Sequence, residues 1–347
     1  MFEAAQDFER VVFATDPAAG LRTIIAIHST TLGPAVGGCR IHAYADEHNA
    51  LADVVRLAES MTWKAAAAGL DLGGGKAVII ADPARDKSEA LLRAFARVVD
   101  SLGGRYVTSV DVGSTTQDLD EIKKETSYVV GTSPFNGGSG DPSPITAAGV
   151  VSAIKSCLHH VFRDTTLAGR RIAIQGAGKV GYSLAGLAAG EGAEVVVADT
   201  NLDNLGRAVR DFGVETAPPD RILETECDVL APCALGGVLN DETITRIKCR
   251  IVCGSANNQL ADIEDADAMR RSDILYAPDF IVNAGGLISV ADEMTGWNHD
   301  RVLARVDGIG RTLLDILHLA AVLNISTAQA AVQYAKRRIR KLSRLNR

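Results

Sequence analysis

The chain has 347 residues, of which 47% are hydrophobic and 23% charged, a composition of ordinary folded proteins and a length that favours two domains. The formal net charge of −7 argues against the basic excess of a nucleic-acid-binding domain. The first residues are acidic and lack an apolar signal region, and no later window reads as a membrane span, so we expect a cytoplasmic protein with small-molecule partners. The six cysteines lack the spacing of a zinc site, and we expect no metal.

The first 130 residues alternate strand and helix patterns. Strands are expected over 9–15 and 22–28, and a helix over 47–68 carries Lys64 near its end. A helix over 88–102 and a strand over 105–109 follow. The segment VDVGSTTQDLDEI then offers three candidates for the N-cap of the next helix: Ser114, Thr115 and Thr116.

Residues 70–83, LDLGGGKAVIIADP, place Lys76 after three glycines at the start of an apolar strand. A phosphate-binding P-loop is excluded, because Leu70 stands where its first glycine belongs, Ala77 stands where Ser or Thr belongs, and a strand follows instead of a helix. Gly73, Gly74 and Gly75 are expected to clear space so that substrate and water reach the Lys76 amine. A plain glycine turn with a surface lysine is the alternative.

The second half begins with a linker at 131–144, GTSPFNGGSGDPSP, which is rich in Gly, Pro and Ser and marks a domain boundary. A helix over 145–161 follows, and the pattern is α/β from Arg170 to about residue 283. Helices are expected at ADEMTGW, over 301–323 and over 327–343. The fold class is therefore α/β, with two domains separated by a cleft.

Residues 170–200 contain a strand, the spacing Gly-x-Gly-x-x-Gly, a helix and a second strand that ends at Asp199. This is the full context of a Rossmann dinucleotide-binding fingerprint, in which the pyrophosphate binds at the helix N-terminus and the acidic residue accepts from the ribose hydroxyls. A carboxylate there, followed by Thr200 and Asn201 instead of an arginine, favours NAD over NADP. The predicted cofactor contacts are Gly176, Ala177, Gly178, Lys179, Val180, Gly181, Asp199 and Thr200. A structural glycine turn is the alternative.

The first half supplies Lys64, Lys76 and Asp111 as candidates for reacting groups, and none of the seven histidines stands in an evident loop constellation. One ammonium to hold a carboxylate, one amine to act as a base and one carboxylate to handle an amino group form a plausible set. Lys64 is alternatively the cationic end of its helix, and Asp111 is alternatively a helix N-cap.

At this point the sequence resembles the Glu/Leu/Phe/Val amino-acid dehydrogenase family, closest to the leucine, valine and phenylalanine dehydrogenases. The family's lysine signature is matched by Leu70, Gly73, Gly74, Gly75, Lys76, Val78, Asp82 and Pro83. The similarity continues through GPAVGGCR (33–40), MTWKAAAAG (61–69), GGRYVTSVDVG (103–113), APCALGG (231–237), GSANNQL (254–260), YAPDFIVNAGG (276–286) and VADE (290–293).

The resemblance implies a role for each matched residue. Lys64 would bind the substrate carboxylate, helped by the backbone near Gly37 and Gly38, while Lys76 would be the catalytic base and Asp111 would interact with the amino group. Asn258 would contact substrate and nicotinamide. The nicotinamide pocket would be lined by Ala231, Pro232, Cys233 and Asn283, and the side-chain pocket by Val36, Ser109, Leu287 and Val290.

The resemblance also implies the domain roles. Residues 1–140, with the C-terminal helices of about 300–347 returning to them, would form the substrate, catalytic and oligomerisation domain. Residues 141–299 would form the Rossmann-type NAD domain, and the subunits would associate as a homo-oligomer.

The expected activity is the NAD-dependent, reversible oxidative deamination of an apolar L-amino acid to the 2-oxo acid and ammonia. Leucine, valine or isoleucine is favoured because the implied pocket offers no partner for a charged side chain. Because Lys76 must be neutral part of the time to act as a base, deamination is expected to work best at alkaline pH. Phenylalanine as the main substrate, a hydroxy-acid dehydrogenase and a non-catalytic NAD(H)-binding sensor remain alternatives.

Overall fold

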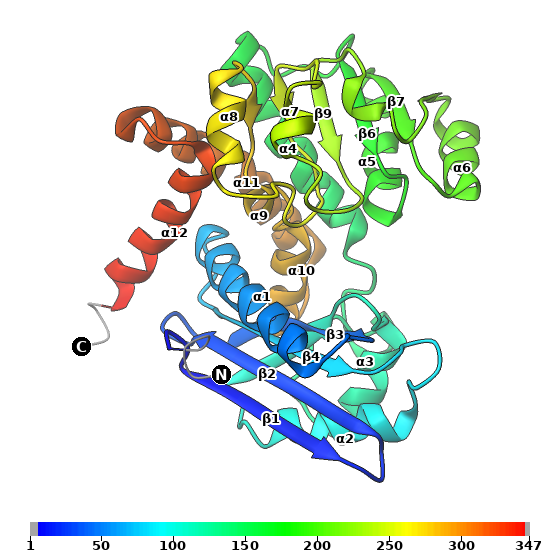
Figure 1. Ribbon diagram of the computed structural model, residues 1–347, viewed down its shortest axis with the longest axis vertical. Coiled ribbons are helices and arrows are strands. Elements are labelled where there is room, and N and C mark those ends of the chain that lie inside the picture. The colour runs from blue at the N-terminus through cyan, green and yellow to red at the C-terminus, as the bar shows by residue number, and fades with distance from the viewer. Residues whose placement is uncertain (1–5, 344–347) are drawn as a thin grey trace. The chain divides into compact units, whose positions relative to one another are not determined.

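The computed structural model describes residues 6–343 and divides into two compact units (Figure 1). Unit 1 contains the chain up to Asp141, residues Ser289–Asn298 and the chain from Ala335 onward. Unit 2 contains Pro142–Ile288 and His299–Tyr334. Residues 1–5 and 344–347 of the ranges expected for the first domain lie outside the described residues.

Unit 1 is built on a mixed five-stranded sheet. Its strands are β1 (Arg10–Asp16), β2 (Leu21–Ser29), β3 (Ala35–His42), β4 (Gly73–Ile80) and β5 (Tyr106–Val110), in the order β1-β2-β4-β3-β5. The β1–β2 and β2–β4 pairs are antiparallel, whereas β3 is parallel to both β4 and β5. The central strand β4 carries the glycine-lysine segment.

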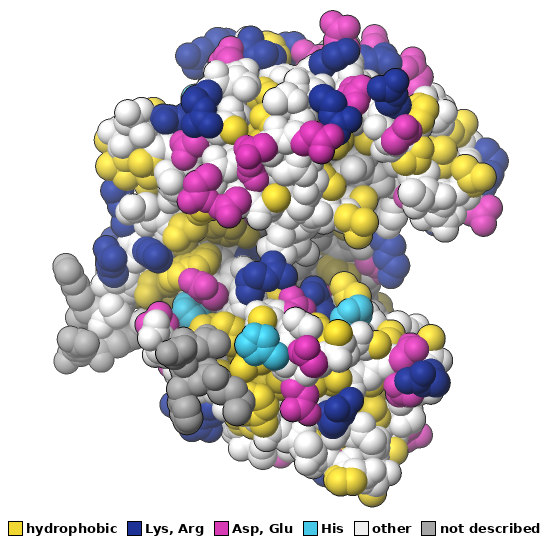
Figure 2. All heavy atoms as spheres, in the orientation of Figure 1, with side chains coloured by type: hydrophobic (Ala, Val, Ile, Leu, Met, Phe, Trp, Pro, Cys, Tyr) yellow, Lys and Arg dark blue, Asp and Glu magenta, His cyan; other side chains and the backbone are white. Residues whose placement is uncertain are grey.

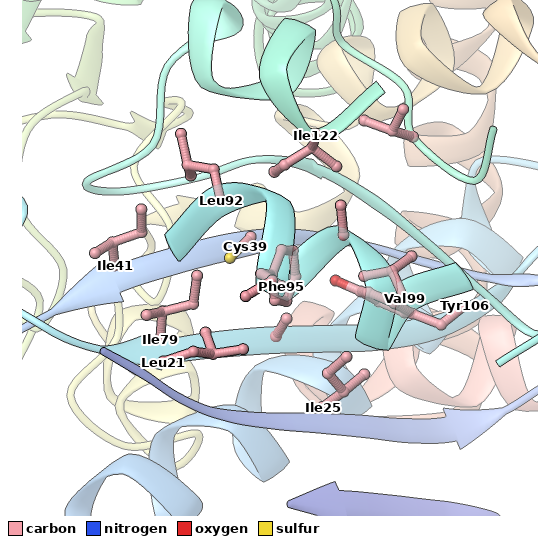
Figure 3. Close-up of a cluster of buried hydrophobic side chains, with 14 of the residues drawn as sticks. Leu21, Ile25, Cys39, Ile41, Ile79, Leu92, Phe95, Val99, Tyr106 and Ile122 are labelled. Atoms are coloured by element: carbon pink, nitrogen blue, oxygen red, sulfur yellow. The ribbon is translucent and has the colours of Figure 1, made fainter. Parts of the chain in front are cut away.

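Helices cover both faces of this sheet (Figure 1). Helix α1 (Glu47–Ala67) packs on one face through residues such as Val54 and Ala58, which meet Val78 of β4. Helices α2 (Glu89–Asp100) and α3 (Thr116–Lys123) lie on the other face, where a larger core contains Phe95, Tyr106 and Ile122 (Figure 3). Side-chain N-caps begin all three helices: Asp46, Ser88 and Thr115.

Unit 2 is built on a six-stranded, entirely parallel sheet. Its order is β11-β10-β9-β6-β7-β8, the order of a doubly wound dinucleotide-binding fold. The strands are β6 (Arg171–Gln175), β7 (Glu194–Ala198), β8 (Glu215–Thr216), β9 (Val229–Pro232), β10 (Ile251–Val252) and β11 (Leu275–Tyr276). Because β9 follows β8 in sequence but pairs with β6, the strand order reverses between β6 and β9.

The helices of unit 2 include a pair of long helices, α4 (Ser143–Phe162) and α11 (His299–Leu323), which pack against each other. The shorter helices are α5 (Lys179–Gly190), α6 (Leu202–Phe212), α7 (Asp241–Ile244), α8 (Asp265–Arg271) and α9 (Asp279–Val282). Two further helices have residues in both units, α10 (Gly285–Glu293) and α12 (Thr327–Ser343). The 3₁₀ turns are η2 (Pro134–Asn136) and η3 (Ile222–Glu224).

The C-terminal part of the chain differs from the expected assignment of about 300–347 to the first domain. Helix α11 belongs to unit 2 because it packs on α4, and only the chain from Ala335 belongs to unit 1. Conversely, Ser289–Asn298 belongs to unit 1 although it falls within the expected NAD domain of 141–299. The helix expected at ADEMTGW ends at Glu293, where successive turns lead to Gly296 in a left-handed conformation with φ of 85°.

By length and composition alone, helix α4 could cross a membrane, with a mean hydropathy of 1.3, although the sequence was not expected to contain a membrane span. Helices α11 and α12 pass the same test only as one span, despite a bend of 108° between them. Helix α4 packs against α11 and α5 inside unit 2, and the core helix of a folded domain has the same length and composition.

Charged side chains of both signs are interspersed on the face of the molecule shown in Figure 2. The acidic side chains are in slight excess over the whole chain, which gives the formal net charge of −7. A protein that tracks a phosphate backbone shows instead a basic patch or stripe on one face.

Candidate functional site

The candidate reacting groups of unit 1 share one face of its sheet. In the parallel registers of β3, Val36 pairs with Gly74 of β4, and Gly38 pairs with Ser109 of β5. Paired residues of neighbouring strands point to the same side, and side chains alternate along a strand. The face packed against α1 therefore carries Val36, Gly38, Arg40, Gly74, Lys76, Val78 and Ser109, with Asp111 just beyond the end of β5.

Lys76 and Asp111 form an ion pair on this face, with 3.0 Å between Lys76 Nζ and Asp111 Oδ2. Lys76 is only 6% exposed. The pair spans β3, and a Cβ atom at Gly38 would lie 2.7 Å from the Asp111 Cβ and 2.4 Å from the Val110 carbonyl oxygen. A side chain at position 38 would therefore displace Asp111, and the glycine is what allows the pair to form.

Asp111 has a second cationic partner that the sequence reasoning missed. Arg40 Nε lies 3.0 Å from the same Asp111 Oδ2, and Arg40 also contacts Asp53 of α1 at 2.7 Å. Burial alone would raise the pKa of Asp111, but the charges of Lys76 and Arg40 outweigh burial and lower it. The signal was present in GPAVGGCR, because strand alternation puts Arg40 on the face of Gly38.

The three glycines before Lys76 are buried against the protein itself. A Cβ atom would lie 1.9 Å from the Ser29 carbonyl oxygen at Gly73, 2.1 Å from the Thr62 amide nitrogen at Gly74, and 2.9 Å from the Tyr106 ring at Gly75. The expectation that these glycines clear space for substrate and water is therefore wrong. They let β2, α1 and Tyr106 pack tightly around the strand that holds Lys76.

Lys64 lies half-buried in the last turn of α1. The same helix end is fixed to the sheet by Thr62, whose backbone packs on Gly74 and whose Oγ1 lies 2.8 Å from His28 Nδ1. The position of Lys64 is thus compatible with both a helix-end cation and a ligand-binding ammonium.

The alternative of Asp111 as an N-cap is wrong, because Thr115 and Asp118 form the capping box of α3.

Three of the four residues implied for the side-chain pocket lie in unit 1. Ser109 and Val290 flank Gly131, where an added Cβ atom would lie 3.0 Å from Ser109 Oγ and 3.7 Å from a Val290 methyl group. Val36 is buried on the same sheet face as Ser109. Leu287 is also buried, one turn before Val290 on α10, but belongs to unit 2.

In unit 2 the glycines of the fingerprint each meet a different requirement. Gly176 has a φ of 99°, which only glycine adopts readily, and a Cβ atom at Gly181 would lie 1.9 Å from the Gly176 carbonyl oxygen. Gly178 begins α5 without a side-chain cap, and a Cβ atom there would meet nothing within 4 Å. Open space beside uncapped N–H groups fits the binding of a pyrophosphate.

The other fingerprint residues surround this loop. Asp199 follows β7 and accepts hydrogen bonds from the backbone N–H of Ala177, at 2.6 Å, and of Asn201, at 2.7 Å. Its carboxylate thus lies against the glycine-rich loop. Thr200 and Lys179 are exposed, and Val180 is half-buried in the first turn of α5.

The predicted nicotinamide residues gather at the carboxyl ends of β9 and β10. Ala231 and Pro232 end β9, and the Cys233 N–H donates to the Gln175 carbonyl at 2.7 Å, beside the glycine loop. Asn258 follows β10 in a left-handed conformation with φ of 52°, and its carbonyl accepts from Gly237 at 2.7 Å. Ligands of doubly wound sheets bind at this place, where the strand order reverses.

Asn283 supplies an acceptor that fits a bound carboxamide. Its Nδ2 donates to the Ser255 carbonyl at 3.1 Å and to Asn257 Oδ1 at 2.8 Å. Its Oδ1 is buried and has no hydrogen-bond partner among residues 6–343. A buried unpaired acceptor is costly, and the amide group of a nicotinamide would satisfy it. The residues of unit 2 therefore fit a nicotinamide dinucleotide.

Gln259 was also missed by the sequence reasoning. It is fully buried, and its Nε2 donates to the carbonyls of Gly254, at 2.8 Å, and Ala256, at 3.0 Å. These bonds shape the loop that presents Asn257 and Asn258. Its place inside GSANNQL was visible, but a buried amide cannot be told from an exposed one in a glycine- and asparagine-rich loop.

Family profiles match both parts of the chain. Residues 8–128 match the profile of the Glu/Leu/Phe/Val dehydrogenase dimerisation domain, and residues 137–207 and 200–345 match that of Glutamate/Leucine/Phenylalanine/Valine dehydrogenase. The leucine dehydrogenase of Thermoactinomyces intermedius is 48% identical over 96% of this chain and 91% of its own length. The phenylalanine dehydrogenase of Lysinibacillus sphaericus is 47% identical over 95% and 88%.

One solved structure is similar over nearly the whole chain. The L-tryptophan dehydrogenase of Nostoc punctiforme superposes with a TM-score of 0.86 at 39% identity, covering 99% of this chain and 100% of that one. Dehydrogenases of this kind use a nicotinamide cofactor. The chain belongs to the glutamate/leucine/phenylalanine/valine dehydrogenase family and is an amino-acid dehydrogenase.

Proposed function

We propose that the protein catalyses the reversible, NAD-dependent oxidative deamination of an apolar L-amino acid to the 2-oxo acid and ammonia. The observation that carries this proposal is the buried ion pair of Lys76 and Asp111 in a member of this family. An amine and a carboxylate 3.0 Å apart can move protons to and from the amino group and water of a deamination.

Substrate binding is assigned to the sheet face of unit 1. The Lys64 ammonium would hold the substrate carboxylate, helped by the backbone of Gly38. The side chain would meet Val36, Ser109, Leu287 and Val290, which offer no charge and so disfavour glutamate. Leucine, valine or isoleucine is favoured, and the leucine dehydrogenases among the relatives support this choice.

A bound NAD would supply the hydride acceptor, and loss of a hydride from the substrate Cα would leave an imino acid. Lys76 would then take a proton from a water molecule as the water oxygen bonds to the imino carbon. Asp111 would help to protonate the nitrogen of the resulting carbinolamine, and the C–N bond breaks as the carbonyl forms. The products are the 2-oxo acid, ammonium, NADH and one proton, which balances one amino acid, NAD and one water.

NAD is proposed over NADP because of Asp199. Its carboxylate would accept from the ribose hydroxyls and would repel a 2′-phosphate, and the exposed Thr200 that follows supplies no positive charge. The residues that would hold the dinucleotide are Gly176, Ala177, Gly178, Lys179, Val180, Gly181, Asp199 and Thr200. Ala231, Pro232, Cys233, Asn258 and Asn283 would surround its nicotinamide end.

Homo-oligomerisation through unit 1 is proposed as well, because residues 8–128 match a profile described as a dimerisation domain. The cytoplasmic location stays a prediction.

The test is NADH formation from NAD over a panel of L-amino acids at alkaline pH, with the reverse reaction run on the matching 2-oxo acids and ammonia. Turnover confined to aliphatic substrates supports the proposal. A strong preference for phenylalanine, which the phenylalanine dehydrogenases among the relatives make a real alternative, would keep the chemistry but overturn the pocket assignment. NADH binding without any turnover would favour a non-catalytic sensor.

A further inference from the structure

Arg40 connects two carboxylates that come from different parts of unit 1. Its Nε lies 3.0 Å from Oδ2 of Asp111, which follows β5, and its Nη1 lies 2.7 Å from Oδ2 of Asp53, on α1. The Arg40 side chain is only 21% exposed, and those of Asp111 and Asp53 are 17% and 16% exposed. Ion pairs with so little solvent access hold geometry better than exposed ones do.

Asp53, the carboxylate on α1 that Arg40 contacts, has further hydrogen-bond partners. The Tyr44 hydroxyl donates to Asp53 Oδ2 at 2.7 Å, and Arg56 contacts the other oxygen, Oδ1, at 2.9 Å. Tyr44 and Arg40 thus share one oxygen of Asp53, while the 54% exposed Arg56 contacts the other oxygen. The helix that bears Asp53 also bears Lys64 in its last turn.

The near end of the connection acts on the reacting pair. Arg40 and Lys76 approach the same oxygen of Asp111, and their strands lie side by side. Two cations on one carboxylate oxygen restrict its rotation and fix the distance between Lys76 and Asp111. The planar guanidinium contacts two carboxylates at once through different nitrogens, which a single lysine ammonium cannot do in the same geometry.

We propose that Arg40 is a positioning residue for the deamination, which holds Asp111 against Lys76 and ties this pair to the helix that carries Lys64. The inference rests on the proposed function of Lys76 and Asp111. Arg40 touches neither substrate nor cofactor in this role and acts through Asp111.

Charge supports the same role. The titratable and charged groups around Asp111 are Lys76 on β4, Arg40 and Cys39 on β3, and Tyr106 on β5, with Tyr44, Asp53 and Asp118 further out. Arg40 and Lys76 together lower the pKa of Asp111 against the effect of burial. Loss of Arg40 would leave Asp111 and Asp53 without the cation between them, so the pKa of Asp111 would rise.

The test compares three variants of the full chain. Arg40→Met keeps an unbranched side chain that matches the apolar part of arginine, but removes the charge and both contacts. Arg40→Lys restores the positive charge but not the planar guanidinium that contacts two carboxylates at once. Arg56→Met is the matched control, because Arg56 is 54% exposed and pairs with Asp53, not with Asp111. For each variant, kcat and KM for L-leucine and NAD are measured from pH 6 to pH 11, together with the thermal unfolding temperature.

Arg40→Met is expected to lower kcat by about tenfold to a hundredfold, the usual effect of misplacing a reacting group, with KM for NAD unchanged. The acidic limb of its pH profile should move to higher pH. Arg40→Lys should move that limb back toward the wild-type position while kcat stays low, and Arg56→Met should behave as wild type. A wild-type pH profile and kcat in Arg40→Met, with only a lower unfolding temperature, would overturn the inference.

A second measurement separates this inference from the proposed function. Titration of the Asp111 carboxylate by ¹³C NMR, assigned with Asp111→Asn, needs no turnover. An upward shift of the Asp111 pKa in Arg40→Met and none in Arg56→Met supports the positioning role. No shift in either variant would refute it, whereas an inactive wild-type enzyme with this shift would refute the proposed function alone.

Discussion

Lys76 Nζ and Asp111 Oδ2 lie 3.0 Å apart although β3 separates the strands that carry them. The contact depends on Gly38 of β3, because any side chain there would collide with Asp111. A base held on the central part of a sheet by such packing loses little freedom when the substrate binds, and pre-organised groups of this kind are what catalysis requires.

Replacing Lys76 with alanine should reduce the turnover of L-leucine by about 10²-fold to 10⁴-fold, the usual contribution of a general base. Binding of NADH should be unchanged, because the dinucleotide residues lie in unit 2. The measurement is steady-state kinetics with NADH binding followed by fluorescence. Lys87→Ala is the control. Lys87 Nζ pairs with Asp118 Oδ2, at 2.8 Å, and not with the reacting pair. Full turnover in Lys76→Ala would remove the catalytic assignment.

Replacing Asp199 with alanine should raise KM for NAD by about tenfold or more, since hydrogen bonds to a charged group are worth about 1.5–3 kcal/mol. The preference for NAD over NADP should fall at the same time, because the charge that repels a 2′-phosphate is gone. Initial rates with both cofactors measure this change. Asp203→Ala, in the first turn of α6, serves as a control. Unchanged kinetics with NAD and no gain with NADP would contradict the cofactor assignment.

Replacing Gly74 with alanine should destabilise unit 1, because the new Cβ would lie 2.1 Å from the Thr62 amide nitrogen and α1 would have to shift. Overpacking of this kind costs about 1–3 kcal/mol. KM for L-leucine should rise too, since Lys64 lies on the displaced helix end. Thermal unfolding and kinetics are compared with Gly308→Ala, where the added Cβ would meet no atom within 4 Å among the described residues outside its own stretch of helix backbone. If Gly74→Ala matches that control in both, the packing argument fails.

Acid should weaken the network of Asp53 and Asp111. Burial raises the pKa of Asp53, but the Tyr44 hydrogen bond and the Arg40 charge lower it overall from its ordinary value of 3.8. A depressed pKa in the folded state stabilises the protein fully above 3.8, and this contribution is lost as the pH falls through the lower folded value. The difference in thermal unfolding temperature between wild type and Asp53→Asn should therefore be constant from pH 5 to pH 7 and shrink below pH 3.8. A difference independent of pH would count against the ion-pair network.

The parts of the account that were predictable from sequence are local ones. Spacing within about thirty residues was enough to predict the strand, glycine loop and helix around Gly178 and the second strand that ends near Asp199, and the structure has them in that order. Helix α1 was expected over 47–68 and spans Glu47–Ala67, because its apolar face is a local sequence pattern.

The parts that were not predictable depend on contacts between distant segments. The Arg40–Asp53 pair depends on how α1 packs on β3, and no local sequence pattern shows that packing. The purpose of Gly73, Gly74 and Gly75 was misjudged for the same reason, since their neighbours Ser29, Thr62 and Tyr106 come from three other elements. The amphipathic pattern of α11 likewise shows that one side is buried but not that α4 covers it.

The most direct test of the central claim is the ratio of ammonia to NADH released when the wild-type enzyme oxidises L-leucine with NAD at alkaline pH. Oxidative deamination through the Lys76 and Asp111 pair predicts one ammonia for each NADH, with both products lost together in Lys76→Ala. NADH formed without ammonia, or from a 2-hydroxy acid but not from any L-amino acid, would contradict it.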